Sequence, residues 1–434
     1  MRIACLLTGL AALLVATSSA CTGGAVSPGE ADAGAADAAL HGGGAADAAL
    51  HEGGAAPDGA PAEDAPLPST RDGGDAGRDS AAWQDAVADG SAGDDGPPHD
   101  AVAGDAGPHA SGLPWRSGVS PGTGDGAQAI TNTSGFAAWR GRPVDVAAVF
   151  IGKNSWQVSY AAYLANEVLR ANGAVATLID HGIDPVLTVP LVTLADAGKF
   201  AFVAAGSIDA QHQAVADKIH GVVGSHRIYL RLGHEADEGY PWSYVNHDGA
   251  GQPDPAVPAD YKAAWRRIAS IYRATIPGAR MVWNRLKSGH DQPITAYYPG
   301  DDVVDIISVD VYDNGSGGYC DAATAPGWLN LCYGSYNATT GMAKGLKGTL
   351  DFAQSRGKKM AIDEWGATND DLAPANGANN GFFAGGVWDF LVANSAAVEY
   401  ESYFNRAGGG RHQIWPRTSY NPLPSDAYLA HWHP

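Results

Sequence analysis

From about Val144 onward, short apolar runs rich in β-branched residues alternate with longer segments of helical periodicity. We predict strands at eight of these runs, which cover residues 144–152, 175–182, 200–208, 227–235, 279–285, 304–312, 358–365 and 397–405. Helices are predicted between them, for example at 156–172 and at 258–275, where Pro258 stands in the first turn. Strands that alternate with helices indicate a parallel sheet.

Eight strand–helix units in one domain favour a (β/α)8 TIM barrel over an open doubly wound sheet. The first predicted strand is not followed by the Gly-x-Gly-x-x-Gly pattern, which weakens the case for a dinucleotide-binding fold. In a (β/α)8 barrel the active site lies where the loops after the strands converge. The pattern therefore predicts that the chemistry lies at the carboxyl ends of the strands.

The first quarter of the chain differs in composition from the rest. An apolar stretch from Leu6 to Val15, followed by small residues, predicts a secretory signal peptide at residues 1–20. The small residues before Cys21 also resemble a bacterial lipobox, although Ser18 stands where that pattern usually has leucine. We expect Cys21 to be lipidated, with plain secretion as the alternative. Either way, we expect an exported bacterial protein, anchored at the cell surface or secreted.

Residues 21–112 consist mainly of Ala, Gly, Asp and Pro, with a ten-residue near-repeat that starts at Ala35 and again at Ala45. Such a segment buries too little apolar surface to offset the entropy of ordering, so we predict a disordered linker here and one catalytic domain at 113–434. From residue 22 to residue 112 there are 17 acidic residues against two arginines, which accounts for most of the formal net charge of −20. This charge argues against nucleic-acid binding.

Only two of the four cysteines, Cys320 and Cys332, fall in the predicted domain. Two cysteines in a Gly-rich stretch of an exported protein favour a disulfide that closes a surface loop, here within residues 315–334. The pair offers too few ligands for a metal site, and we expect neither a metal nor a cofactor. The long loop that contains the pair is also a candidate for substrate contact.

Polar and aromatic side chains gather at the predicted strand ends. The fourth strand ends in His234 and Glu235, within the stretch RLGHEADEGYPW, and the seventh ends in Asp363, Glu364 and Trp365. Two carboxylates that flank one cleft suit glycosidic bond cleavage, since one donates a proton while the other attacks the sugar. The other strand ends supply Trp283 and Asn284, Tyr312, and Tyr403 with Asn405.

Aromatic rings beside the two carboxylates suit a sugar substrate, because the C–H faces of sugars stack on rings. The candidate rings are Tyr240, Trp242, Trp365 and Tyr403. Each ring taken alone is explained at least as well by ordinary packing, and the same holds for His234. Their coincidence at strand ends favours a binding site.

These motifs together resemble glycoside hydrolase family 26, a β-mannanase family of the (β/α)8 clan. The stretch RLGHEADEGYPW is similar to the family pattern Arg-x-Gly-His-Glu-Met-Asn-Gly followed by aromatics. The segments YKAAWRRI (261–268), YYPGDDVVDIISVDVYD (297–313) and AIDEWG (361–366) match in the expected order.

The resemblance implies a role for several residues. Glu235 would be the general acid/base and Glu364 the nucleophile, while His234 would bind sugar and Tyr312 would hydrogen-bond the nucleophile. Tyr240 falls where the family usually has a Trp that lines the cleft. We predict substrate contact for these residues and for four more: Trp242, Asn284, Trp365 and Tyr403.

The chain departs from the family pattern directly after the proposed acid. Ala236, Asp237 and Glu238 stand where Met, Asn and Gly are usual. The two acidic side chains are expected to raise the pKa of a neighbouring carboxyl, which suits a general acid. They also change the surface that a sugar meets, so the family is better supported than the mannan specificity.

The sequence therefore predicts a monomeric, retaining endo-β-glycanase that hydrolyses a polysaccharide, β-1,4-mannan first of all, by double displacement. The alternatives on the same scaffold are a β-1,3-xylanase and a mixed-linkage β-glucanase. A surface carbohydrate-binding protein without turnover and a structural lipoprotein are alternatives of another class. The presence of both glutamates disfavours a pure binder, and the aromatic side chains disfavour the structural lipoprotein. Contact with a membrane is expected only through the lipid on Cys21.

Overall fold

The computed structural model describes residues 109–152, 167–193, 196–237, 257–287, 293–315, 318–320, 328–369, 379–407 and 411–434. The predicted signal peptide, Cys21 and nearly all of the predicted linker lie outside these residues, and so do Glu238, Tyr240 and Trp242. Most of the predicted helix at 156–172 and much of the loop at 315–334 also lie outside them.

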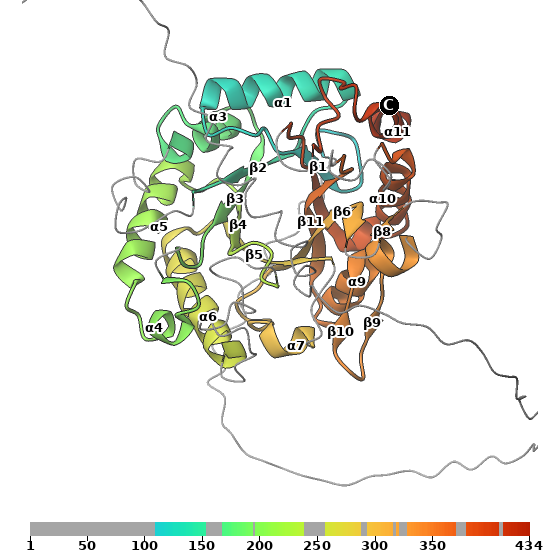
Figure 1. Ribbon diagram of the computed structural model, residues 1–434. Helices are drawn as coiled ribbons and strands as arrows, with labels where there is room; N and C mark the ends of the chain where they lie inside the picture. The colour runs from blue at the N-terminus through green and yellow to red at the C-terminus, as the bar shows by residue number, and fades with distance from the viewer. Residues whose placement is uncertain are drawn as a thin grey trace, which may run out of the picture.

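Eight parallel strands close into a barrel at the centre of the molecule (Figure 1). Their order around the barrel is β1, β12, β11, β6, β5, β4, β3, β2, so β1 pairs with both β12 and β2 and no edge is left open. The strands are β1 (Arg116–Val119), β2 (Val146–Phe150), β3 (Asp184–Val189), β4 (Ile228–Leu232), β5 (Ala279–Leu286), β6 (Ile306–Tyr312), β11 (Lys359–Gly366) and β12 (Val398–Tyr403).

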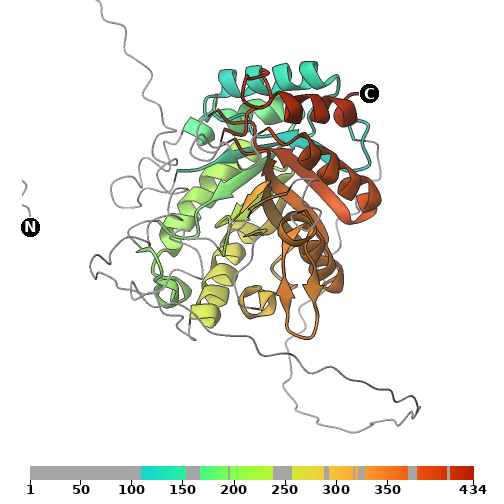
Figure 2. The same cartoon turned by 45° about the vertical axis from the view of Figure 1, so that its right-hand side comes forward.

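Helices surround the barrel, as Figures 1 and 2 show. They are α1 (Gly126–Arg140), α3 (Ala174–Asp180), α4 (Phe200–Ala204), α5 (Asp209–Val223), α6 (Val257–Thr275), α7 (Ile294–Tyr297), α9 (Gly345–Ser355), α10 (Gly381–Ala393) and α11 (Pro422–Trp432). The short elements are η1 (Glu167–Leu169), η3 (Trp328–Tyr333), η4 (Ser395–Ala397), and the hairpins β7 (Asn314–Gly315) with β8 (Gly318–Tyr319) and β9 (Tyr336–Asn337) with β10 (Met342–Ala343). Within the described ranges, no helix is both long and apolar enough to span a membrane.

The TIM-barrel prediction is confirmed, but two of the eight predicted strands are wrong. Residues 175–182 lie largely in α3 and residues 200–208 begin with α4. In α3 the buried side chains are Ala174, Val175 and Leu178, a helical spacing that the β-branched composition of this run concealed.

The two strands that the sequence pattern missed are β1 and β3. β1 has only four residues, with the sequence RSGV, and its Gly118 permits a close approach to β2: an added Cβ would lie 2.2 Å from the carbonyl oxygen of Val146. β3 begins Asp-Pro, which is typical of a turn, yet Pro185 stands at the start of the strand, where a proline is tolerated.

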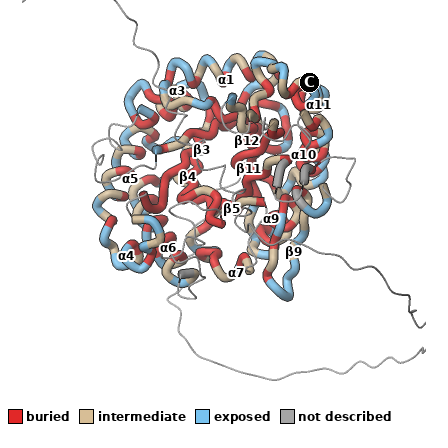
Figure 3. The backbone as a smooth tube through the Cα atoms, in the orientation of Figure 1, coloured by how far each residue is buried: buried red, intermediate tan, exposed pale blue. Residues whose placement is uncertain are grey.

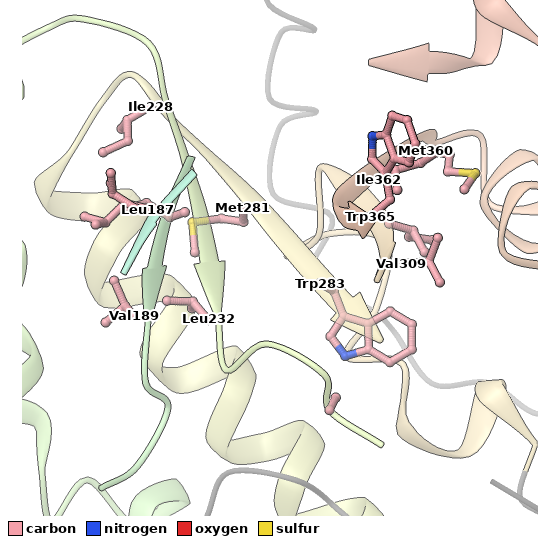
Figure 4. Close-up of a cluster of buried hydrophobic side chains, with 14 of the residues drawn as sticks. Leu187, Val189, Ile228, Leu232, Met281, Trp283, Val309, Met360, Ile362 and Trp365 are labelled. Carbon is pink, nitrogen blue, oxygen red and sulfur yellow. The ribbon is translucent and has the colours of Figure 1, made fainter. Parts of the chain in front are cut away.

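Buried residues gather on the barrel strands and on the sides of the helices that face them (Figure 3). Their side chains form two layers, one inside the barrel and one between the barrel and the helices. The inner layer is a small cluster that includes Val146, Val186, Tyr229, Val282 and Tyr400. The outer layer is larger and includes the side chains that Figure 4 shows on β3, β4, β5, β6 and β11. In α6, confirmed close to its predicted bounds, buried side chains recur at helical spacing: Tyr261, Ala264, Trp265, Ile268, Ala269 and Tyr272.

We expect acidic pH to destabilise the barrel through His212, which lies in the outer layer. Its ring contacts the hydroxyl of Tyr272 and the carbonyl oxygen of Leu191, each at 3.0 Å, and burial lowers its pKa from 6.5 to about 4. Between these two values the unfolded chain binds more protons than the folded one. The stability that the neutral His212 contributes is therefore lost as the pH falls, by about 2 kcal/mol between pH 8 and pH 5. Urea unfolding of the native protein and of His212→Gln at both pH values measures this contribution as the change in their difference in unfolding free energy, because the other titrating groups are common to both proteins; a difference that does not change with pH would contradict the assignment.

Candidate active site

Glu235 stands in a tight turn that directly follows β4. Gly233 and Glu235 both have positive φ, 62° and 46°, a conformation that costs a non-glycine residue free energy and that often marks a functional site. The Glu235 backbone N–H donates to the side-chain oxygen of Asn284 on β5, at 2.6 Å. The side chain is almost fully buried. The fold thus fixes the proposed acid at the carboxyl end of the fourth strand.

Glu364 lies near the carboxyl end of β11, the seventh barrel strand in chain order, and hydrogen bonds hold both of its carboxylate oxygens. Nη2 of Arg231 donates to Oε1 at 2.5 Å, and the hydroxyl of Tyr312 donates to Oε2 at 2.7 Å. The side chain is only 6% exposed. Two donors from two different strands therefore orient this carboxylate, as a nucleophile requires.

The guanidinium of Arg231 is fully buried among three carboxyl groups. It lies 3.0 Å from Asp310, 2.5 Å from Glu364 and 3.8 Å from Asp363, and its Nε donates to Thr188 at 2.8 Å. Burial alone would lower the pKa of Arg231, but the three carboxyl groups outweigh it and raise this pKa. One permanent cation therefore serves three acidic side chains.

Three ionised carboxyl groups would exceed the single positive charge of Arg231, and shifts in the pKa values of Asp310 and Asp363 reduce this excess of negative charge. Burial, followed by the nearby Glu364, raises the pKa of Asp310 well above its ordinary value, and burial raises the pKa of Asp363. Both groups thus hold a proton more readily than an exposed aspartate. When Asp310 is protonated, it no longer competes with Glu364 for the positive charge of Arg231.

Asn284 joins the Glu235 turn to this network rather than facing a ligand. Its side-chain oxygen accepts from the Glu235 backbone, and its amide nitrogen lies within 3.0 Å of Ser308, Asp310 and Asp363. The residue is fully buried. We therefore correct the predicted substrate contact of Asn284, since both ends of its amide are used inside the protein.

Half-buried aromatic rings line the same end of the barrel. Phe150, the last residue of β2, lies 5.2 Å from the guanidinium of Arg231 and 6.0 Å from the ring of His234. Phe404, directly after β12, contacts both Phe150 and Tyr312 edge-on. Sequence reasoning missed both phenylalanines because each is part of an apolar run, although their positions at strand ends were a usable signal.

Trp365 and Tyr403 lie in the outer packing layer, which corrects the prediction that they contact substrate. Trp365 is fully buried in the hydrophobic cluster of Figure 4. Its indole N–H donates to Glu401 at 2.6 Å. Tyr403 is 1% exposed and packs edge-on against Trp365, with ring centroids 4.7 Å apart. Rings enclosed in this way offer no face to a sugar.

The position of Asp237 in the sequence suggested that its charge acts on the proposed acid, but its carboxylate has other partners. Its carboxylate accepts from the backbone of Leu286 at 2.6 Å and lies 3.4 Å from the guanidinium of Arg285. Both partners of this ion pair are buried. The carboxylate therefore fastens the turn after β4 to β5, and its charge is compensated locally.

A cation that sequence reasoning missed, Lys287, also interacts electrostatically with Glu235. Its ammonium donates to the carbonyl oxygen of Tyr312. Burial lowers its pKa to about 8, against the opposing effects of Asp313 and Glu235. Burial also raises the pKa of Asp313 to about 7. Burial thus shifts the pKa values of Lys287 and Asp313 in opposite directions, each toward the uncharged form, and the charge of each group partly offsets the shift of the other.

Cys320 and Cys332 are joined by a disulfide, with their Cα atoms 6.0 Å apart. The bond lies against the carboxyl end of β6, because the Cys320 N–H donates to the Asp313 carbonyl at 2.8 Å and Sγ of Cys332 lies 3.4 Å from the carbonyl oxygen of Tyr312. The disulfide therefore braces the strand that carries Tyr312. In the described part of the chain, no group of three or more His, Cys, Asp or Glu side chains is arranged to hold a metal ion.

A closed (β/α)8 barrel with paired glutamates at the ends of its fourth and seventh strands is the architecture of a barrel glycoside hydrolase. Residues 204–378, which contain both glutamates, match the model of glycosyl hydrolase family 26. The match covers 175 of the 434 residues, and this part of the chain, with both glutamates, is similar to glycoside hydrolase family 26.

Individual relatives are distant. Mannan endo-1,4-beta-mannosidase of Bifidobacterium adolescentis is 24% identical over 287 residues, which make up 62% of this chain and 26% of that protein. The chain thus spans about a quarter of the length of this curated relative.

Two solved structures similar to this chain are also of mannanases. The Bacillus subtilis mannanase BCman is 12% identical, with 72% of this chain and 85% of that chain covered and a TM-score of 0.46. A modular endo-beta-1,4-mannanase from Cellulomonas fimi is 16% identical, with 68% and 65% covered and a TM-score of 0.46.

Proposed function

We propose that this protein is a retaining endo-β-glycanase that hydrolyses β-1,4-mannan. The observation that carries the proposal is the pair of buried glutamates, one in the turn after β4 and one on β11 between two hydrogen-bond donors. The mannan specificity is supported by the name of the Bifidobacterium relative.

In the first step, the Glu364 carboxylate attacks the anomeric carbon while the carboxyl group of Glu235 donates its proton to the departing glycosidic oxygen. The C–O bond breaks, and a glycosyl ester forms on Glu364. Arg231 and Tyr312 orient the attacking carboxylate and compensate its charge before the attack.

In the second step, Glu235 is a carboxylate and takes a proton from water. The water oxygen attacks the anomeric carbon and releases Glu364. The configuration at that carbon is inverted twice and therefore retained. This mechanism requires the two carboxyl groups to lie about 5–5.5 Å apart in the enzyme.

Incubation of the full-length protein with β-1,4-mannan, β-1,3-xylan, mixed-linkage β-glucan and cellulose tests the proposal. We expect mannan to be cut into oligosaccharides of several lengths, and proton NMR should show that the first product keeps its anomeric configuration. Turnover of xylan or mixed-linkage glucan alone would favour the alternatives on the same scaffold. Binding without cleavage would favour a carbohydrate-binding protein, and an inverted product would exclude the covalent step.

A further inference from the structure

Among the described residues, two aromatic rings contact the ring of Tyr312, whose hydroxyl donates to Oε2 of Glu364. Phe404 meets it edge-on, with ring centroids 5.9 Å apart and planes at 79°. His412 lies closer and more nearly face to face, with centroids 4.4 Å apart and planes at 34°. His412 comes from the loop after β12, far along the chain from Tyr312 on β6. This contact therefore exists only because the fold brings the two together.

The polar contacts of His412 hold its ring in this place. Nδ1 lies 3.0 Å from the carbonyl oxygen of Ala367, and since a carbonyl only accepts, Nδ1 carries the proton. The hydroxyl of Tyr403 donates to the His412 carbonyl at 2.8 Å. Both contacts tie the histidine to the carboxyl ends of β11 and β12. The same end of β11 carries Glu364.

The backbone of β11 leaves room for the histidine at Gly366. An added Cβ there would lie 3.2 Å from Cβ of His412 and 3.5 Å from Cγ. His412 is only 8% exposed, and the face of its ring is against Tyr312. The imidazole is therefore placed to support the tyrosine rather than to meet a sugar.

We propose that His412 is a positioning residue that acts through Tyr312: its ring keeps the tyrosine hydroxyl on the nucleophile Glu364 throughout the reaction. This inference rests on the function proposed above. When the glycosyl ester forms, the carboxylate loses its charge and the hydrogen bond from Tyr312 weakens. A ring fixed by its neighbour keeps the donor in place until the carboxylate is released again.

Two substitutions distinguish the effect of the His412 ring from the effect of its hydrogen bond to the Ala367 carbonyl oxygen. His412→Phe keeps an aromatic ring on Tyr312 and loses the bond to Ala367, whereas His412→Gln keeps a side-chain donor and loses the ring. In the full-length protein we expect kcat of the Gln variant to fall about tenfold, with KM little changed, and the Phe variant to stay within about threefold of the native value. In a Tyr312→Phe background, His412→Gln should add little further loss, because its effect passes through the tyrosine hydroxyl.

Crystal structures of the two variants give a readout that does not depend on activity. The tyrosine hydroxyl should stay within hydrogen-bond distance of Glu364 in the Phe variant and move away from it in the Gln variant. An unmoved hydroxyl in the Gln variant, equal losses of kcat in both variants, or additive losses with Tyr312→Phe would each overturn the proposal. Native protein without glycanase activity would overturn the proposed function instead, and the two crystal structures would still decide whether His412 positions Tyr312.

Discussion

Replacement of Glu364 by alanine should abolish turnover of every glycan that the protein cleaves, with a loss of roughly 10⁴-fold or more in kcat, because the variant lacks the carboxylate that forms the glycosyl ester. Glu235→Ala should cost as much on polysaccharide, whose leaving group needs a proton. On an aryl glycoside with an activated leaving group, however, the first step should survive in Glu235→Ala, since such a group departs without proton donation. Steady-state and burst kinetics on both kinds of substrate measure this difference.

Azide separates the roles of the two glutamates further. In Glu235→Ala, azide should restore turnover of the aryl glycoside by attacking the glycosyl ester, which gives a glycosyl azide of retained configuration. In Glu364→Ala, any azide product should have inverted configuration, because azide replaces the nucleophile itself. Equal and unrescuable losses in both variants would contradict the assignment of roles.

Glu399→Gln is a matched control for these two variants. Glu399 is also a buried glutamate on a barrel strand, but it lies near the amino end of β12, where Oε1 accepts from the hydroxyl of Tyr229 at 3.0 Å. Its replacement removes one negative charge from the barrel, as Glu364→Ala does, but at the opposite end. Native-like kcat in this control, with a loss in the other two, places the effect at the carboxyl ends of the strands.

The two carboxylates could be predicted from the sequence because Glu235 directly follows an apolar strand and Glu364 lies near the end of another. β4 and β11 are apolar runs with β-branched residues that end abruptly in polar ones, and this is the pattern that barrel geometry places at the active face. Errors in the second and third predicted strands did not disturb this result. Three strands were predicted before β4, and three are present there, because β1 and β3 take the place of the two wrongly predicted strands.

The aromatic side chains could not be sorted by the same reasoning, because whether a ring faces the cleft or the helices depends on one residue of register. β11 has a register shift between Ile362 and Glu364 in its pairing with β6, and the regular alternation of sides is interrupted there. After the shift, Trp365 packs outside the barrel, on the opposite side of the strand from its neighbour Glu364. No feature of the sequence indicates that irregularity.

The electrostatic partners were hidden for a different reason. Lys287 and Arg231 are cationic side chains at strand ends, where a single sequence gives no measure of burial. Only the fold shows that Lys287 is 5% exposed and that Arg231 is fully buried. Burial lowers the effective dielectric constant and so strengthens the electrostatic interactions of both side chains with the nearby carboxyl groups. His412 lies far from Tyr312 in the sequence, so its contact with the tyrosine has no local signal at all.

Arg231→Met should lower both the stability and the activity of the protein. The substitution introduces an apolar side chain of similar length and removes the cation that contacts Glu364, Asp310 and Asp363. Breaking a buried ion pair from one side costs about 3–5 kcal/mol of unfolding free energy. The destabilisation should shrink at lower pH, because protonation of the carboxyl groups removes the uncompensated charge. Urea unfolding followed by circular dichroism measures it.

A second substitution separates the two effects of Arg231. In Arg231→Met combined with Asp310→Asn, one of the uncompensated carboxyl groups is gone, so part of the lost stability should return. Activity should not return, because Oε1 of Glu364 still lacks the donor that orients it. Arg267→Met, which breaks a pair with Asp209 on the surface, should leave both quantities near their native values. Recovery of activity together with stability in the double variant would show that Arg231 serves the fold alone, and that the orientation of the nucleophile depends on Tyr312.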